Sequence, residues 1–293
     1  MTTPLSEKFT LIVTVREREE WVVRNCELYA QMPFNVIIAD SSKLLIHDLT
    51  KIAETAPNIV YLYNPGCLYY QMIRKATEVA NTEYVAIIPD DEIMYPGAIR
   101  ECVTFLEKNK GHSFCDGYWD RWSDWDNKVT NQVLLNLCTD DIKERISTLS
   151  KGEFWKAPTA AVVRSSVSQE IHTFLCENTA LQPVRYYDKI WLFIALCMGN
   201  FKPVTYIMGS RNPISGRYIC QDDYPEEMRR DLSFNSILEE SRLGALIEYF
   251  QKYGYDFDDA SRFVTHIFKS GFRDRSDALL DDADYNNWMM RKF

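Results

Sequence analysis

The chain has 293 residues, with 33 Lys and Arg against 42 Asp and Glu, so its net charge is −9. Its composition, 46% hydrophobic and 26% charged, is typical of a folded globular protein and excludes long intrinsic disorder. The acidic balance argues against a nucleic-acid partner, because phosphate contacts need clustered Lys and Arg. The length favours one large domain, alone or with an appendage.

We expect neither a secretory signal nor a membrane span. The longest apolar run, residues 190–198, is shorter than the roughly 20 residues of a span. The 8 cysteines and 4 histidines are scattered without a C-x-x-C pair, so we expect reduced thiols and no zinc site. We expect a cytoplasmic protein and leave open a peripheral association with the inner face of a membrane.

The first hundred residues alternate strand and helix patterns. Short runs of apolar and β-branched residues predict four strands, at 9–15, 36–39, 59–63 and 84–88. Apolar residues at helical spacing predict three helices, at 21–32, 69–80 and from Pro96 onward. Repeated β-α units indicate a parallel sheet with right-handed crossovers and helices on both faces.

The remaining two thirds of the chain are less regular. Within residues 111–150, the evenly spaced Trp119, Trp122 and Trp125 are expected either to line a sugar-binding surface or to pack a loop against the core. Further along, strands are expected at 160–163 and 204–208, and a helix at 187–198. Amphipathic patterns then continue to the end, so we divide the chain into a catalytic domain at 1–220 and a helical C-terminal extension at 221–293.

Three consecutive carboxylates, Asp90, Asp91 and Glu92, follow directly after the fourth predicted strand. Ligands of parallel α/β sheets lie at the carboxyl ends of the strands, which is where these acids fall. Adjacent anions repel one another, and Mg²⁺ or Mn²⁺ would remove the repulsion by taking their oxygens as ligands. The alternative is a turn whose acids favour the dipole of the following helix.

The order of these segments resembles the GT-A glycosyltransferases of the family 2 type, from Phe9 to about Arg217. Residues 37–42 are similar to the family's "VVDDGS" strand, and residues 84–97 to the segment with its D-x-D motif. Pro89 stands at the first D-x-D position and Asp91 at the second. The resemblance implies an α/β fold of the GT-A, Rossmann-like kind, a mostly parallel sheet flanked by helices.

The resemblance also implies individual roles. Asp91, assisted by Glu92, would hold Mn²⁺ or Mg²⁺, and Asp90 would reach the donor's ribose. Asp40 would contact the base or ribose, the alternative being an Asx turn with the serines that follow. The other implied donor-binding residues, for which an ordinary strand, turn or surface role is the alternative, are Thr14, Arg16, Gly66, Arg74 and Arg211.

A second acid, Asp188, precedes the apolar helix expected at 190–198. The segment resembles the family's E-D motif, whose Asp is the general base of inverting enzymes, although Tyr187 replaces the usual Glu. Capping of the helix is the alternative role for Asp188.

The resemblance therefore implies a metal-dependent, inverting transfer of a sugar from a nucleotide-diphosphate donor, most simply a UDP-sugar. The acceptor would be a hydroxyl of a saccharide or lipid-linked saccharide, in glycan or polysaccharide synthesis. A sugar-nucleotidyltransferase is a second reading, but it favours a Gly-rich loop where this chain has residues 16–18. The third reading is a non-catalytic binding protein on the same fold, suggested by Pro89 and Tyr187. A dinucleotide oxidoreductase is disfavoured, because no G-x-G-x-x-G follows the first strand.

Overall fold

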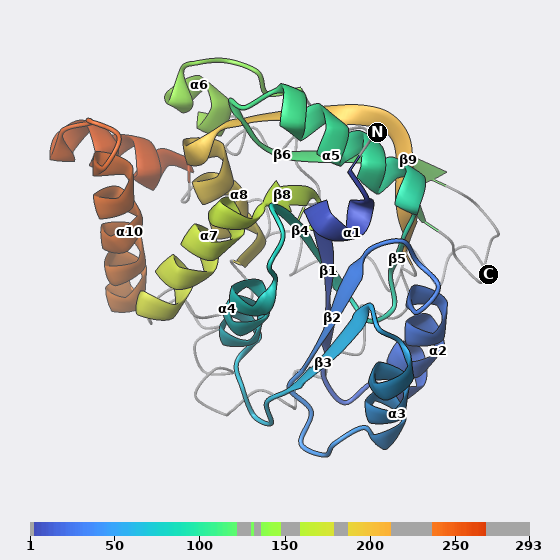
Figure 1. Ribbon diagram of the computed structural model, residues 1–293. Coiled ribbons are helices and arrows are strands. Elements are labelled where there is room, and N and C mark those ends of the chain that lie inside the picture. The colour runs from blue at the N-terminus through green and yellow to red at the C-terminus, as the bar shows by residue number, and fades with distance from the viewer. Residues whose placement is uncertain are drawn as a thin grey trace, which may run out of the picture.

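The computed structural model describes residues 3–121, 130–131, 136–147, 159–178, 187–211 and 236–267 (Figure 1). The strands are β1 (Phe9–Val15), β2 (Asn35–Asp40), β3 (Ile59–Tyr63), β4 (Tyr84–Pro89), β5 (Ile93–Met94), β6 (His112–Arg121), β7 (Thr130–Asn131), β8 (Val162–Arg164) and β9 (Asn200–Arg211). The helices are α1 (Leu5–Lys8), α2 (Glu19–Tyr29), α3 (His47–Thr55), α4 (Tyr69–Val79), α5 (Pro96–Lys108), α6 (Ile142–Ser147), α7 (Ser165–Glu177), α8 (Tyr187–Met198) and α10 (Ser236–Gln251). A further helix covers 257–267.

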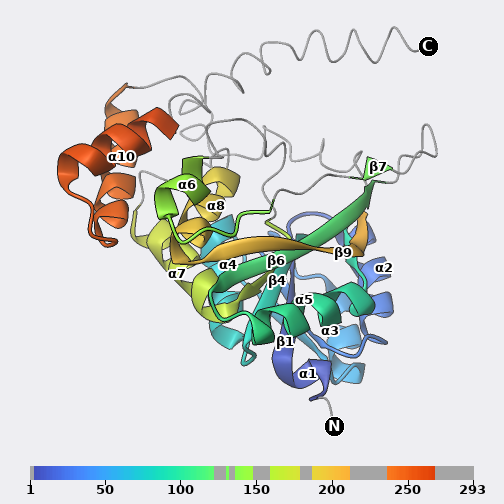
Figure 2. The ribbon, with the colours of Figure 1, turned by 90° about the horizontal axis from the view of Figure 1, so that it is seen from above.

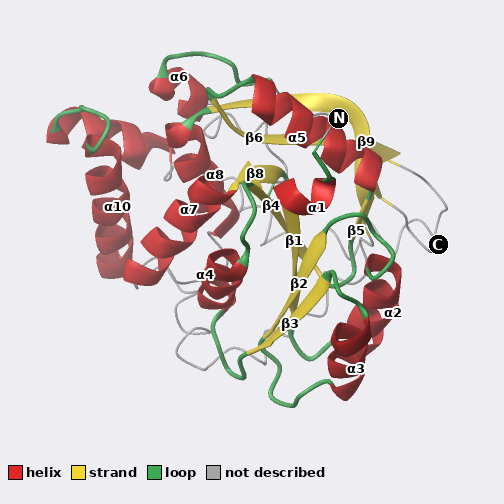
Figure 3. Cartoon of the chain, in the orientation of Figure 1, coloured by secondary structure: helices red, strands yellow, loops and turns green. Residues whose placement is uncertain are grey.

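Within these ranges the strands form one mixed sheet in the order β3-β2-β1-β4-β8-β6-β9-β5 (Figure 3). The short β7 pairs with β6 (Figure 2). β1 pairs in parallel with both β2 and β4, and β2 pairs in parallel with β3. The short β8 is antiparallel to both β4 and β6, so β6 and its parallel partner β9 run in the direction of β1–β4. Six strands therefore have their carboxyl ends at the same edge of the sheet. The parallel arrangement predicted for the first four strands is confirmed.

Alternate residues of the strands supply two separate cores. Ile12 and Ile37 face an apolar cluster with residues of α4, α7, α8 and α10. Leu11 and Val36 face a second cluster with residues of α2, α3 and α5. Figures 1 and 2 accordingly show α7, α8 and α10 on one side of the molecule and α2 and α3 on the other. The β1 strand is buried on both faces, which explains its continuously apolar sequence.

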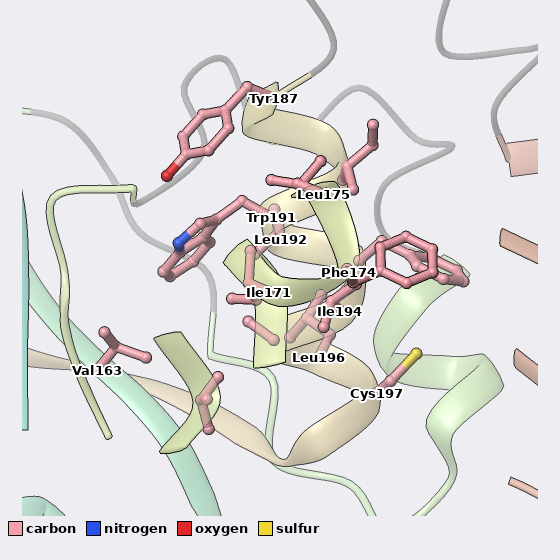
Figure 4. Packing of buried hydrophobic residues seen from close by; sticks show 14 of the residues in the cluster. Val163, Ile171, Phe174, Leu175, Tyr187, Trp191, Leu192, Ile194, Leu196 and Cys197 are labelled. Carbon is pink, nitrogen blue, oxygen red and sulfur yellow. The ribbon is translucent and has the colours of Figure 1, made fainter. Parts of the chain in front are cut away.

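The apolar run that ends at Met198 is helix α8, which is 12 residues long and almost wholly buried. Trp191 and Leu192 of α8 pack beside Ile171 and Leu175 of α7 (Figure 4). No helix in the described part of the chain is long and apolar enough to cross a membrane. Burial inside the protein therefore accounts for the hydrophobicity of α8.

Trp119 lies in β6 and is only 1% exposed, with its indole N–H donating to Asp116 Oδ1 at 3.0 Å. The core-packing alternative therefore holds for Trp119, while Trp122 and Trp125 lie outside the described residues. Close packing continues across the neighbouring strand, because a Cβ atom at Gly209 of β9 would collide with the Ile93 carbonyl oxygen. Only glycine at this position lets β9 pair with β5, which directly follows the acidic turn.

The described C-terminal helices pack onto α7 and α8. Tyr249 meets Phe174 with ring centroids 4.9 Å apart, and Phe250 meets Phe193 at 6.0 Å. Both aromatic residues of α10 belong to the apolar cluster that covers one face of the sheet. The predicted extension thus shares a core with the α/β part, and the division of the chain at residue 220 stays a prediction.

Replacing Phe250 by Ala should lower the free energy of unfolding by about 3–5 kcal/mol, because its buried ring leaves a cavity. The ring stacks on Tyr255 and Phe263 at 4.4 and 5.1 Å, so the loss would reach both C-terminal helices. Phe257→Ala is the matched control, since Phe257 is 58% exposed and should cost at most about 0.5 kcal/mol. Equal effects of the two substitutions in urea titrations would contradict a shared core.

Candidate donor-binding and catalytic site

The parallel register brings the predicted acids to one edge of the sheet. Val15 at the end of β1 is aligned with Asp40 of β2, and Thr14 is aligned with Pro89 of β4. Asp40 and Asp90 therefore flank the end of the same central strand. This placement follows from the strand directions alone and agrees with the position of ligands in open α/β sheets.

Arg18, in the loop between β1 and α2, bridges the two aspartates that follow β4. Its Nη1 lies 3.0 Å from Asp90 Oδ1 and its Nη2 lies 3.2 Å from Asp91 Oδ2. The carboxylate side chains are 2% and 5% exposed, and Arg18 is 19% exposed. A planar guanidinium suits this arrangement, because its fork can donate to two carboxylates at once.

The backbone of the β1–α2 loop is held in a strained shape just before Arg18. Glu17 has a φ of 55°, in the left-handed region that residues with a Cβ rarely adopt. Its N–H donates to Ser42 Oγ at 2.8 Å, and its Oε1 accepts from the Lys43 N–H at 2.7 Å. These bonds tie the loop to the end of β2 and fix the direction in which the next residue leaves it.

Asp90 is the more strongly perturbed of the two aspartates. Burial raises the pKa of its carboxyl group to about 7; Arg18 opposes this rise, and the negative charges of Asp91 and Asp40 add to it. Its Oδ1 accepts from Arg18, but its buried Oδ2 has no hydrogen-bond partner in the described residues. The backbone at this position is held separately, because Asn25 Nδ2 donates to the Asp90 carbonyl at 2.7 Å.

Asp40 is fully buried and makes the Asx turn expected as the alternative to donor binding. Its Oδ1 accepts from the Ser42 N–H at 2.8 Å, and its Oδ2 accepts from the Tyr61 hydroxyl at 2.6 Å. Accepting one bond at each oxygen leaves a carboxylate with further lone pairs. The turn fixes the orientation of Asp40, and its donor-binding role stays a prediction.

The turn after β3 lies beside the Asx turn at the end of β2. The Gly66 N–H donates to the Ser41 carbonyl at 3.3 Å, and the Asn64 N–H donates to the Asp40 carbonyl at 2.9 Å. Gly66 has a φ of 70° with open space where a Cβ would be, so backbone conformation is what requires glycine. Lys75 of α4 donates to Asn64 Oδ1 at 2.8 Å, which places a cation at this edge of the sheet.

The four remaining predicted donor residues lie in three places. Thr14 and Arg211 belong to strands that end at the site: the Thr14 hydroxyl donates to the Ile88 carbonyl at 3.2 Å, and Arg211 ends β9. Arg16 is exposed on the loop after β1. Arg74 points along α4, where it pairs with Glu78 at 2.9 Å. Among the described residues, none of the acids predicted to bind the donor contacts Arg74. The loop at 212–217 lies outside the described residues.

Glu92 is anchored to the opposite side of the acidic turn. Its carbonyl accepts from the Tyr29 hydroxyl at 2.9 Å, and its N–H donates to the Pro89 carbonyl at 3.3 Å. Burial raises the pKa of Tyr29, and the negative charge of Glu92 adds to the rise. The backbone of Glu92 is therefore held both by α2 and by the end of β4.

Asp188 is the second residue of α8 and is half-buried. The helix start is located by Tyr187, whose ring meets Tyr69 edge-to-face at 5.1 Å. Tyr69 opens α4, immediately after the turn that carries Gly66. The first turn of α8 therefore lies on the same side of the sheet edge as the β3 turn, and it comes from an element separate from the acidic turn.

A buried histidine secures this helix start. His172 of α7 is fully buried; its Nδ1 lies 2.6 Å from the Ser168 carbonyl and its Nε2 lies 2.8 Å from the Tyr187 hydroxyl. A carbonyl can only accept, so Nδ1 carries the proton and Nε2 accepts from Tyr187. Burial lowers the pKa of His172 to about 4, which keeps the ring neutral.

Two of these features were not predicted from the sequence. The sequence predicts no role for Arg18, although a cation in the loop after β1 is the available signal for a partner of the β4 acids. His172 was read as an isolated histidine. Its partner Tyr187 lies on another helix, and no sequence pattern joins the two.

The acidic turn fits a divalent cation. Asp90 has an unpartnered buried oxygen, and the two adjacent carboxyl groups share a single guanidinium. In the part of the chain that the structure describes, no group of three His, Cys, Asp or Glu side chains forms a complete cation cage. Two carboxylates suffice for Mg²⁺ when the phosphates of a substrate supply further oxygens.

Comparison with solved structures identifies the fold. A structure of S. aureus TarS 1–349 in complex with UDP-GlcNAc matches with a TM-score of 0.59 and 11% identity, covering 91% of this chain and 73% of that one. A second structure of TarS 1–349 matches with a TM-score of 0.51 and 12% identity, covering 92% and 91%. A longer TarS structure, of which 53% is covered, matches with a TM-score of 0.51 and 13% identity.

The chain has a GT-A-like fold, as the sequence resemblance predicted. TarS is a GT-A-like family 2 glycosyltransferase, and at this low identity the likeness concerns the fold. No family model matches the sequence, and no curated protein does.

His172→Gln should change the pH dependence of stability. The pKa of His172 lies below that of the unfolded chain, so its contribution is present above pH 6.5 and is lost as the pH falls toward 4. From pH 7.5 to pH 4 the wild type should therefore lose about 3 kcal/mol more than the variant, since one pH unit of pKa difference corresponds to about 1.4 kcal/mol.

Urea titrations at both pH values measure this difference. The matched control is His47→Gln, because His47 is exposed at the start of α3. Its stability should follow the wild type at both pH values. A His172→Gln protein that also follows the wild type would contradict the burial of a neutral histidine.

Proposed function

We propose that the chain is a glycosyltransferase that moves a sugar from a UDP-sugar to an acceptor hydroxyl. The observation that carries this proposal is the convergence of Asp40, Asp90 and Asp91 at the carboxyl ends of parallel strands. It is supported by the GT-A-like fold, shared with TarS structures in complex with UDP-GlcNAc and with UDP. UDP-GlcNAc is therefore the first donor to test.

The donor would lie along the edge of the sheet, from β2 to the acidic turn. Asp40 is buried and fixed in orientation, so its remaining lone pairs suit a base N–H or a ribose hydroxyl. Asp90 would reach the ribose. The exposed Arg16 would supply positive charge for the diphosphate, and Arg211, which ends β9 at the same edge, is the second candidate.

Asp91 would hold Mn²⁺ or Mg²⁺, with Glu92 on the same turn as the second candidate ligand. When bound, the cation would neutralise charge on the diphosphate leaving group. Asp91 suits this role because it belongs to a rigid turn, bounded by β4 and by the pairing of β5 with β9.

Asp188 would act on the acceptor side. As general base it would take the proton of the acceptor hydroxyl while that oxygen attacks the anomeric carbon and the bond to the diphosphate breaks. Attack opposite the leaving group inverts the configuration. Tyr187 and His172 hold the start of α8, so the backbone that carries the Asp188 carboxylate is fixed in position. A saccharide or lipid-linked saccharide, in glycan or polysaccharide synthesis, is the acceptor class that we propose.

Release of free nucleotide from a panel of UDP- and GDP-sugars, with and without Mn²⁺, tests the activity. A glycosyltransferase releases the nucleoside diphosphate, with UDP donors preferred here. A sugar-nucleotidyltransferase instead consumes a nucleoside triphosphate and releases pyrophosphate. Binding without turnover of any donor would identify the non-catalytic alternative and overturn the proposal.

Asp91→Asn should weaken Mn²⁺-dependent binding of UDP by at least about tenfold, because the carboxamide keeps the shape and loses the charge. Calorimetry of UDP in the presence of Mn²⁺ measures the loss, and thermal unfolding verifies the fold. Asp48→Asn is the matched control, since Asp48 is an exposed residue of α3 paired with Lys51. Unchanged UDP affinity in the Asp91 variant would contradict the cation site and favour the alternative, in which the acids only stabilise the dipole of the following helix.

Asp188→Asn should retain UDP binding and lose sugar transfer by about 10²–10⁴-fold, the range for removal of a general base. Initial rates of UDP release, with an acceptor that supports turnover, measure the loss against Asp48→Asn. Product NMR gives the stereochemistry, and an α-linked donor should yield a β-linked product. Retention of configuration, or near-normal turnover of the variant, would exclude Asp188 as the base.

A further inference from the structure

Arg18 already supplies a positive charge to both aspartates of the acidic turn. One guanidinium contacts both Asp90 and Asp91, at 3.0 and 3.2 Å, and it lies in a loop rather than in a strand or helix. The two aspartate side chains are almost inaccessible, while the Arg18 side chain keeps 19% of its surface exposed. A positive charge that reaches Asp91 must therefore share it with Arg18 or displace it.

The loop around Arg18 is built to aim this side chain. The left-handed Glu17 is tied through Ser42 and Lys43 to the end of β2, so the strain is held by bonds outside the loop. On its other side, the guanidinium lies 6.0 Å from the ring centre of Trp21. Trp21 is thus a neighbour of the Arg18 side chain in addition to the two carboxylates.

The charge count favours exchange over permanent pairing. When both buried carboxyl groups are ionised, the single guanidinium leaves one negative charge uncompensated, and Asp90 Oδ2 has no partner among the described residues. A divalent cation would balance both charges. A displaced guanidinium would then lie next to a site that holds a diphosphate, which is the anion that an arginine fork recognises.

We propose that Arg18 is the resident counter-ion of the Asp90–Asp91 pair, that it competes with Mn²⁺ or Mg²⁺ for Asp91, and that it contacts the donor's diphosphate once displaced. This inference rests on the proposed function, whose cation site it uses. When no cation is bound, Arg18 thereby reduces the repulsion between Asp90 and Asp91. When a cation binds, the released Arg18 becomes available to the donor, so cation binding and donor binding are linked.

The direct test is Mn²⁺ binding without nucleotide, followed by the electron paramagnetic resonance signal of free Mn²⁺. Arg18→Gln should bind Mn²⁺ about tenfold more tightly than the full-length wild type, because the competing charge is gone. Arg24→Gln is the matched control: Arg24 lies 4.8 Å over the same Trp21 ring and should leave the affinity unchanged. Equal or weaker Mn²⁺ binding by Arg18→Gln, or no binding by either protein, overturns the proposal.

The diphosphate contact has its own measurement. With saturating Mn²⁺, Arg18→Gln should bind UDP about tenfold more weakly than the wild type, whereas both should bind uridine equally. Arg18→Lys should fall between them, since an ammonium keeps the charge but loses the fork. Unchanged UDP affinity in Arg18→Gln contradicts the contact.

A measurement on the wild type covers the case in which Arg18→Gln does not fold. In the ¹⁵N-labelled protein, the Nε–Hε resonance of Arg18, assigned with Arg18→Lys, should shift when Mg²⁺ is added and should not shift in Asp91→Asn. An Arg18 resonance that does not shift when Mg²⁺ is added overturns the proposed competition between Arg18 and the cation. If the shift is present but no sugar donor is turned over, the proposed function fails while the competition stands. If a sugar donor is turned over but the Arg18 resonance does not shift, the competition fails while the proposed function stands.

Discussion

The repulsion between two adjacent buried carboxylates, Asp90 and Asp91, is the constraint that organises the site. Removing carboxylates from water is costly unless they are paired and hydrogen-bonded. The guanidinium of Arg18 supplies part of this compensation, and Asn25 fixes the turn through the Asp90 carbonyl. The strained backbone of Glu17 contributes to this compensation, because it directs the Arg18 guanidinium from the end of β1 toward the end of β4.

The sheet makes this concentration of charge useful. Because β1–β4, β6 and β9 run in one direction, their carboxyl ends bring Asp40, the acidic turn and Arg211 to a single edge. Helices α4, α7 and α8 fill one face, and α8 delivers Asp188 from outside the strand series. The acidic turn and the carboxylate proposed as the base therefore come from separate elements, as a single displacement between donor and acceptor requires.

The sequence predicts the elements that are uniformly apolar or clearly periodic. The strands β1–β4 and the helix over 187–198 were found because burial on all sides leaves an unbroken apolar run. Helix α3 was missed because Leu49 is its one fully buried residue among those described. Helix α7 was missed because its buried face includes Ser168 and His172, which interrupt the apolar period. The bridge from Arg18 joins residues more than seventy positions apart, so only tertiary structure reveals it.

The central claim is that a nucleotide diphosphate binds at the carboxyl edge of this sheet. A crystal structure of the full chain with UDP and Mn²⁺ tests it most directly. The account predicts that the diphosphate and Mn²⁺ lie beside Asp91, with the nucleoside against Asp40 and the β3 turn. A nucleotide bound elsewhere, with Asp40 and Asp91 making no contact to it, would contradict the account.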